Sequence, residues 1–323
     1  MSIPEFFKVC KQNHLSKIKE LLESESPTNI NFQDVNRRTA LMIACRNGQL
    51  PLVDLLLTSN KVDLNLRDED GRTALFCACE RGKIDIVKRL LCEWSIHVNT
   101  PKFDGTSPLM ISVSWNLYDI VELLLEDERI GPSLNGVDSM RKNIFHWACA
   151  KGNLEMIKLL MGLKEIDVNA QTNTLLTPFM IACRQSHLEC ITYLLRINEI
   201  KVNSQDRDGK TALFYAAATG NARVLNILLH HQSVDPNLSD AEGWTPLSIA
   251  CSSGHLLCVQ HLLASEKSIN LDSELKNPFK YAKNEKISKL LAKYQQDPVR
   301  VRRKLQRKLN HDGFIFIYLF ILN

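Results

Sequence analysis

Residues 68–99 read DEDGRTALFCACERGKIDIVKRLLCEWSIHVN and contain the pattern that decides the fold of this chain. The first four residues, Asp68 to Gly71, have the composition of a tight turn, because Asp and Gly suit turns and Gly tolerates a positive φ. Thr73 follows where a helix N-cap is expected, since its hydroxyl can accept a backbone N–H there. The stretch therefore predicts a turn that leads directly into a helix.

Two short helices are expected after this turn. Residues 74–81 predict a first helix with small residues at its centre, and Gly82 is typical of a helix end. Apolar residues over 84–91 recur at i, i+3, i+4 and i+7, which predicts an amphipathic second helix. Val98 and Asn99 then close the unit and lead to the next turn.

The same unit recurs along the chain with offsets of 34, 34, 36, 34, 34 and 34 residues. A fixed period of this size is typical of a solenoid, in which each unit buries its apolar face against its neighbours. The phrase that follows each turn recurs at Thr39-Ala40-Leu41, Thr73-Ala74-Leu75, Ser107-Pro108-Leu109, Asn143-Ile144-Phe145, Thr177-Pro178-Phe179, Thr211-Ala212-Leu213 and Thr245-Pro246-Leu247.

This repeat resembles the ankyrin-repeat family over residues 2–294, most of the chain. The resemblance implies an all-α solenoid of helix-turn-helix units with β-hairpin fingers, about seven full repeats between two capping units. We expect an N-terminal cap over 1–33, repeats over 34–276, a C-terminal cap over 277–295 and a basic tail with a hydrophobic end over 296–323. Asn116 and Ser186 replace the Gly after the first helix, so those two units should be less regular, and residues 102–136 should be the least typical.

Catalytic and metal chemistry is not expected. Gly209-Lys210-Thr211 lacks the Gly that a phosphate-binding loop needs five positions earlier. Cys251, His255, Cys258 and His261 are ligand types, but they fall on ordinary repeat positions without the loop of a zinc finger. No arrangement of nucleophile and base appears, so the sequence predicts a protein that is not an enzyme and holds no cofactor and no metal.

The ten cysteines and the absence of a secretory leader favour reduced thiols and a cytoplasmic location, with a nuclear location as the open alternative. Six of the cysteines share one column of the repeat. Neighbouring helices lie roughly 10 Å apart, whereas a disulfide needs Cα atoms within about 7 Å. We therefore interpret these cysteines as small apolar packing residues.

By resemblance, a protein partner of unknown identity binds the concave face made of finger tips and first helices. Interface hot spots favour Trp, Tyr and Arg. Trp94 falls in the connection after a second helix, and we expect it to pack against the edge of the array instead. The candidate partner-binding residues are Arg72, Arg81, Phe103, Trp115, Met140, Trp147, Lys151, Arg184, Tyr215 and Trp244.

The tail carries a different signal from the repeats. Residues 276–323 hold twelve Lys and Arg against three acidic residues, a net charge of +9, so residues 1–275 carry −5 of the chain's total of +4. Val301, Leu305 and Leu309 recur among basic residues and predict a basic amphipathic helix, compatible with a membrane surface, an acidic partner or a binding groove. A non-catalytic scaffold or adaptor for protein–protein interaction is the main hypothesis, and a peripheral membrane or lipid-binding adaptor that uses 299–322 is the alternative.

Nucleic-acid binding is not expected, because the repeats are acidic and the basic run lacks stacking aromatics. The chain is expected to be a monomer. Residues 314–323, FIFIYLFILN, are too short to span a membrane as a helix and are prone to aggregation. They stay open to three interpretations: an alternative or mispredicted last exon, a hydrophobic anchor, or a strand docked on the last unit.

Overall fold

The structure is a computed structural model that describes residues 5–23, 29–59, 61–163, 165–271 and 275–311. Every regular element within these ranges is helical, and they contain no β-strand. The chain divides into two units, which we describe separately: unit 1 is Met1–Ala148 with Gly162–Ile166, and unit 2 is Cys149–Met161 with Asp167–Asn323.

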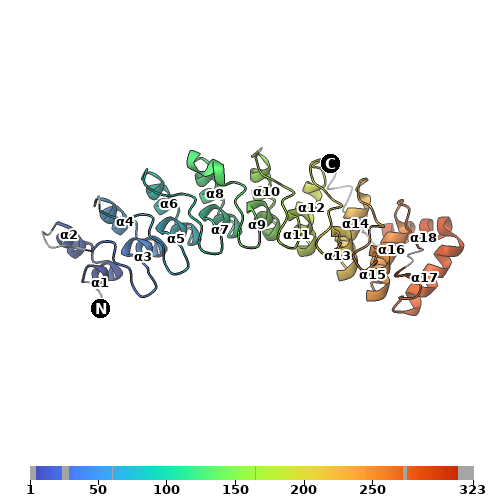
Figure 1. Cartoon of the computed structure of the whole chain (residues 1–323). Helices are drawn as coiled ribbons and strands as arrows, with labels where there is room; N and C mark the ends of the chain where they lie inside the picture. Colours follow the sequence, from blue (N-terminus) through green and yellow to red (C-terminus); the bar gives the residue numbers. More distant parts are fainter. Residues whose placement is uncertain (1–4, 24–28, 60, 164, 272–274, 312–323) are drawn as a thin grey trace. The chain divides into compact units, whose positions relative to one another are not determined.

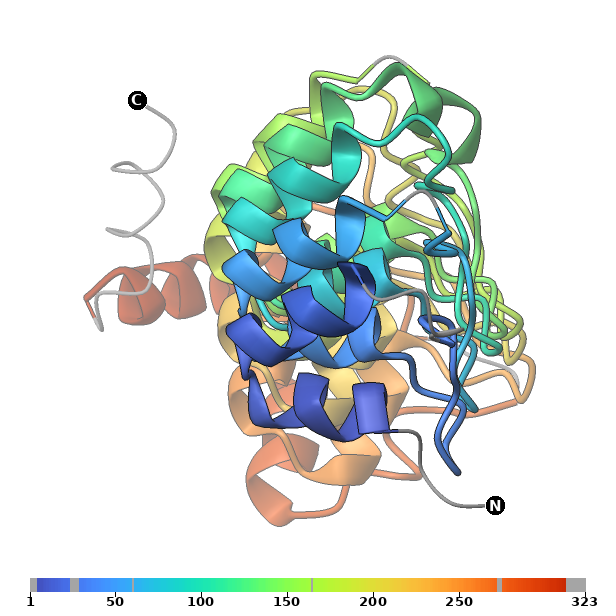
Figure 2. The ribbon, with the colours of Figure 1, turned by 90° about the vertical axis from the view of Figure 1, so that its left-hand side faces the viewer.

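Unit 1 consists of first helices that pack on one another and second helices that pack on one another (Figures 1 and 2). Each first helix also contacts the second helix of its own repeat. The first helices are α1 (Glu5–Gln12), α3 (Ala40–Asn47), α5 (Ala74–Glu80) and α7 (Pro108–Ser114), and the second helices are α2 (Leu15–Glu23), α4 (Leu50–Leu57), α6 (Ile84–Leu91) and α8 (Tyr118–Leu125).

Unit 2 repeats this arrangement. The boundary between the units falls inside α9 (Ile144–Lys151). The first helices that follow are α11 (Pro178–Gln185), α13 (Ala212–Thr219) and α15 (Pro246–Ser253), and the second helices are α10 (Leu154–Met161), α12 (Leu188–Leu194), α14 (Ala222–His230) and α16 (Leu256–Ala264). The predicted paired-helix repeat is thus confirmed.

The helices begin where the N-cap residues predict. The Thr73 hydroxyl accepts the backbone N–H of Phe76 at 3.2 Å, and Asn143 caps α9 by accepting the N–H of His146 at 3.1 Å. Behind the caps, the small residues Ala78 and Cys79 are fully buried. Their size lets α3, α5 and α7 approach closely, which explains why small residues recur at this position.

The fingers are tight turns rather than strands. In the finger of residues 68–72, Asp68 Oδ1 accepts the N–H groups of Asp70 (3.0 Å) and Arg72 (2.8 Å), while the Asp68 N–H donates to the carbonyl of Arg72 at 3.0 Å. One backbone bond joins this finger to the next, from the N–H of Phe103 to the carbonyl of Asp70 at 2.9 Å. The fingers are therefore at the predicted positions, but they are tight turns and not the expected β-hairpins, because the described residues contain no β-strand.

A ladder of asparagines joins the other ends of the repeats. The Asn65 amide donates to the carbonyl of Ser95 at 2.7 Å, and its oxygen accepts the N–H of His97 at 2.8 Å. The closing asparagine thus bridges to the repeat that follows, and the same amide-to-carbonyl bond is made by Asn31, Asn99, Asn169, Asn203 and Asn237. The sequence reasoning missed one member, Asn135, whose amide donates to the carbonyl of Glu165 at 2.5 Å.

Asn116 and Ser186 do not disturb the helix ends of their repeats, contrary to expectation. Both adopt the left-handed conformation, with φ of 62° and 63°, that glycine adopts in the other repeats. The helices α7 and α11 therefore end in the usual way. The repeat over 102–136 does differ: it is two residues longer than the others and contains the 3₁₀ helix η1 (Glu128–Ser133). In η1, Arg129 donates to the carbonyl of Leu91 at 2.9 Å.

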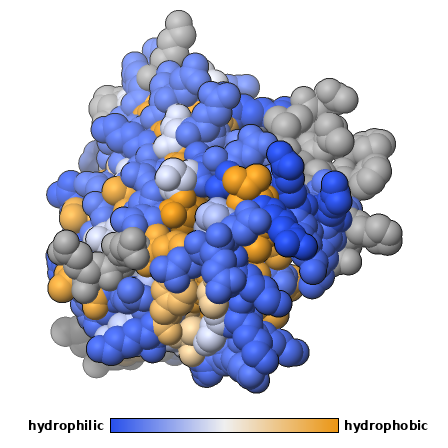
Figure 3. Space-filling view, turned by 90° about the vertical axis from the view of Figure 1, so that its right-hand side faces the viewer, coloured by the Kyte–Doolittle hydropathy of each residue, from blue (hydrophilic) through white to orange (hydrophobic). Residues whose placement is uncertain are grey.

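Unit 2 ends in α17 (Glu285–Gln296) and α18 (Pro298–His311). Residues 277–281 form a turn, so the capping unit lacks a first helix. The predicted basic amphipathic helix is α18, and it packs on α16 and α17 with Leu305 and Leu309 buried. Seen from this end, hydrophilic groups dominate the surface and flank a central band of apolar groups (Figure 3). Residues 314–323 lie outside the described residues, and none of the described helices combines the length and apolarity needed to cross a membrane.

Candidate partner-binding surface

Three predicted residues of unit 1 expose large apolar side chains on the fingers and the ends of first helices. Phe103 is 64% exposed and Met140 53% exposed on neighbouring fingers, and Trp115 is 59% exposed just after α7. The two fingers are joined by a bond from the N–H of Ser139 to the carbonyl of Asp104 at 2.7 Å. The linked fingers and the end of α7 thus present apolar groups that the fold covers only in part.

Sequence reasoning missed a neighbour of Phe103. The guanidinium of Arg67 lies 4.7 Å from the centroid of the Phe103 ring, within the range of a cation–π contact. Arg67 also donates to the carbonyls of Gly71 (3.0 Å) and Pro101 (2.6 Å), which holds it between two fingers. No motif marks such a residue, since Gln33 occupies the same repeat position one unit earlier.

The two predicted arginines of unit 1 differ in their surroundings. Arg72 is 18% exposed in its side chain and is paired with Asp68 (2.9 Å) and Asp70 (2.8 Å). Arg81 is exposed at the end of α5. Arg72 therefore stabilises its own finger through these ion pairs, whereas Arg81 projects into solvent.

Trp147 of α9 is half-buried. The ammonium of Lys142 lies 4.9 Å from its ring centroid. Its indole Nε1 is buried and donates to no acceptor among the described residues. Substitution of Trp147 would thus remove packing as well as a surface contact.

In unit 2, Arg184 and Tyr215 form a pair. The exposed guanidinium of Arg184 lies 5.0 Å from the centroid of the half-buried Tyr215 ring, and the Tyr215 hydroxyl donates to the carboxylate of Asp206. Burial first, and this hydrogen bond second, raise the pKa of Tyr215 above its usual value. Lys151 is exposed at the end of α9.

Trp244 packs against the end of the unit rather than standing free. Its ring meets that of Tyr281 edge-on, with centroids 4.9 Å apart, and its Nε1 donates to Glu242 at 3.3 Å. The ammonium of Lys276 lies 4.8 Å from its centroid. Trp244 therefore packs the C-terminal turn against the last finger.

Trp94 corrects the expectation that it packs on the edge of the array. It is 91% exposed, and the guanidinium of Arg129 lies 5.8 Å from its ring centroid. A position in a connection gives no information on burial. Trp94 sits after α6, on the second-helix side, and so offers a natural control for the exposed tryptophan at the end of α7.

Three of the four residues weighed as zinc ligands have hydrogen-bonding or packing roles in the repeats. His255 Nε2 lies 3.1 Å from the carbonyl oxygen of Ala218, just as His187 Nε2, two repeats earlier, lies 3.0 Å from that of Ala150. Cys251 and Cys258 are buried, and burial raises the pKa of each to about 12. Within the described ranges, no group of three or more His, Cys, Asp or Glu is placed to hold a metal ion.

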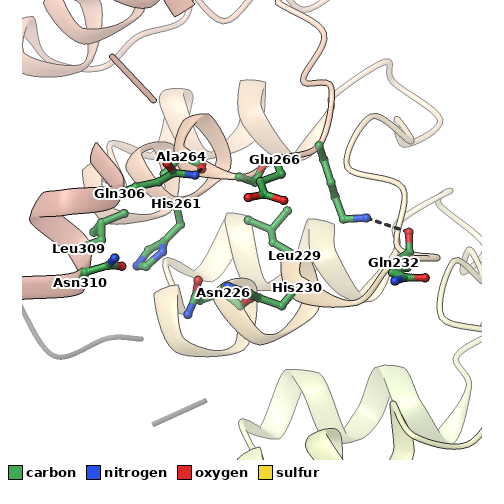
Figure 4. A pocket seen from close by; sticks show the side chains of 12 residues that line it. Asn226, Leu229, His230, Gln232, His261, Ala264, Glu266, Gln306, Leu309 and Asn310 are labelled. Carbon is green, nitrogen blue, oxygen red and sulfur yellow. Dashed lines mark hydrogen bonds between the residues drawn. The ribbon is translucent and has the colours of Figure 1, made fainter. Parts of the chain in front are cut away.

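His261 belongs to a hollow of about 560 Å³ in unit 2, between α14, α16 and α18. Its side chain and those of Asn226 and Asn310 lie toward this hollow (Figure 4). Gln306 of α18 closes one side by donating to the carbonyl of Ala264 at 3.0 Å. The lining is a mixture of neutral polar, charged and apolar groups, which selects no single ligand chemistry.

Comparison with known families agrees with this geometry. A family model described as ankyrin repeats (3 copies) matches residues 6–102, 41–138, 85–172, 145–240 and 228–301. No curated protein matches the chain.

Proposed function

Because the chain belongs to the ankyrin-repeat family, whose repeats are commonly protein-interaction modules, we propose that it is a non-catalytic scaffold or adaptor. The partner binds the fingers and first-helix ends. The observation that carries this proposal is the exposure of Phe103, Trp115 and Met140 on consecutive repeats of unit 1. Aromatic and Met side chains are enriched in protein interfaces and depleted from surfaces that only meet water.

The remaining candidate residues differ in how far their side chains are exposed to a partner. Arg81, Lys151 and Arg184 are exposed and reach solvent, so they can contact a partner. Trp147 and Tyr215 are half-buried and combine packing with an accessible edge. Arg72 and Trp244 are engaged within their own units, so we place them at the margin of the surface.

Affinity purification with mass spectrometry tests the proposal. The full chain is compared with Trp115→Ala and with Trp94→Ala, which deletes the same side chain from a more exposed place on the second-helix side. We expect Trp115→Ala to lose a co-purifying protein that wild type and Trp94→Ala retain. A typical hot-spot tryptophan is worth about 2 kcal/mol or more, roughly a 30-fold loss of affinity. Equal recovery with all three proteins would refute the proposed surface.

Arg184→Glu extends the test to unit 2. It reverses an exposed charge that stacks on Tyr215, so we expect weaker capture with an unchanged circular-dichroism spectrum. A lost helical signal would show instead that the residue supports the fold.

The lipid-binding alternative has less support. Leu305 and Leu309 of α18 pack inside unit 2 and are 6% and 2% exposed, so beyond its charges the docked helix offers a membrane little apolar surface except Val299, which is 57% exposed. Arg302 further fixes the helix by donating to the Tyr294 hydroxyl at 3.1 Å. Sedimentation with acidic vesicles, comparing the full chain with one that ends at Gln295, decides the matter, since equal sedimentation removes the tail as a contact.

A further inference from the structure

A second hollow, of about 300 Å³, lies in unit 1 on the side of the fingers and first helices. Three cations from separate elements line it: Lys11 from α1, Arg38 from the first finger and Arg46 from the last turn of α3. Since α1 and α3 pack on each other, these groups are held by the framework and not by one flexible segment.

The hollow carries an excess of positive charge. Its one acidic residue, Asp68, accepts a bond from Arg72 Nε at 2.9 Å, and Arg38 is paired with Asp34 at 2.8 Å. Neither Lys11 nor Arg46 forms an ion pair with any carboxylate in the described part of the chain. Two cationic groups therefore face the same space without a compensating anion from the protein.

The walls of the hollow strengthen this field. Met42 and Cys77 are 2% and 3% exposed and form an apolar floor beneath the charges. Charges beside a low-dielectric wall interact more strongly with a ligand than charges surrounded by water. The Arg46 guanidinium adds a planar donor set suited to two oxygens of one anion.

We propose that this hollow binds an acidic side chain of the protein partner, either a carboxylate or a phosphorylated serine or threonine. The shared chemistry is an oxyanion held between Lys11 and Arg46. The volume is at the lower limit of ligand pockets, about 300 Å³, which suits one side chain better than a whole cofactor. The biological use of the site rests on the proposed function, because the acidic residue would anchor the same partner.

Ligand-detected NMR with three peptides tests the site without the partner. The peptides share one sequence and differ at a central residue, which is phosphoserine, Glu or Gln. We expect the full-length protein to bind the phosphoserine or the Glu peptide about tenfold more tightly than the Gln peptide, which corresponds to about 1.4 kcal/mol. Preference for phosphoserine alone identifies phosphate as the source, and comparable binding of Glu identifies carboxylate.

Charge-matched variants locate the binding. Lys11→Gln with Arg46→Gln should abolish the preference for the anionic peptide, whereas Lys88→Gln with Arg223→Gln should keep it. The latter pair removes the same charge from exposed positions on α6 and α14. If the double variant fails to fold, Arg46→Lys replaces it. This change keeps the charge but removes the planar donor set, so it should weaken the preference for the anionic peptide.

The inference is overturned if neither anionic peptide is preferred over Gln, or if both double variants lose the preference equally. This result is separable from the proposed function. If Trp115→Ala loses the partner but no anionic peptide is preferred, the proposed partner surface stands and the anion site is refuted. If an anionic peptide is preferred but no partner depends on Trp115, the anion site stands and the proposed partner surface is refuted.

Discussion

Leu124→Ala is the sharpest test of the packing on which the surface rests. Leu124 of α8 is 0% exposed, and α8 packs on α6. The substitution removes three carbon atoms, which at about 0.8 kcal/mol each gives roughly 2.4 kcal/mol of lost transfer free energy. The cavity adds to this, so the expected loss in the free energy of unfolding is about 3–4 kcal/mol, within the usual range for buried leucines.

The neighbouring residue provides a matched control. Leu123→Ala deletes the same atoms from a half-buried position on the same helix, and it should cost roughly 1 kcal/mol. Both are measured by urea unfolding followed by circular dichroism, with hydrogen exchange to locate the effect, because repeats unfold in parts. Amides of α6 and α8 should lose the most protection in Leu124→Ala. A control that costs as much as Leu124→Ala would show that the assigned helix face is wrong.

Two further predictions concern unit 2. Burial first, and the charge of His230 second, lower the pKa of His261 from 6.5 to about 4, so the unfolded chain binds the proton more readily than the folded one in this window. The free energy of unfolding of unit 2 should therefore fall by up to about 3 kcal/mol as the pH drops from 6.5 to 4. Urea titrations at several pH values should show a weaker pH dependence for His261→Leu than for the wild type. The same pH dependence in both proteins would contradict the assignment of this effect to His261. Leu175 holds a φ of +62° where the next repeat has Gly209 at +79°. We expect Leu175→Gly to raise the free energy of unfolding by up to about 1 kcal/mol, because a left-handed non-Gly residue costs about 1–2 kcal/mol and a flexible glycine about 0.5–1. Gly209→Ala should lower the free energy of unfolding by more than about 1 kcal/mol, because the new Cβ would lie 2.8 Å from the backbone N of Ala241. Thermal melts in which Leu175→Gly and Gly209→Ala shift the midpoint in the same direction would count against this reasoning.

The period predicted the fold because it encodes local and nearest-neighbour contacts. Caps such as Thr73 and closing asparagines such as Asn65 act within one unit or on the next one, so their spacing reveals them. Asn135 escaped because the two-residue insertion moved it out of phase with the preceding repeats. Asn116 and Ser186 show that a favourable turn can impose a left-handed backbone without glycine.

The site was less predictable, since a repeat position gives the face of a residue but not what its side chain contacts. Arg72 and Trp115 both fall on the expected side, yet ion pairs engage the former and the latter is 59% exposed. The amphipathic pattern of α18 likewise predicts an apolar stripe without saying that the stripe packs on α16 in the same chain. The cationic hollow joins residues from three elements and has no sequence signature.

Hydrogen exchange of the full chain with and without its captured partner tests the central claim most directly. Recognition through the fingers and first helices predicts slower exchange over residues 102–106, 138–142 and the end of α7, with α4, α6 and α8 unchanged. Protection confined to the second helices would contradict the account.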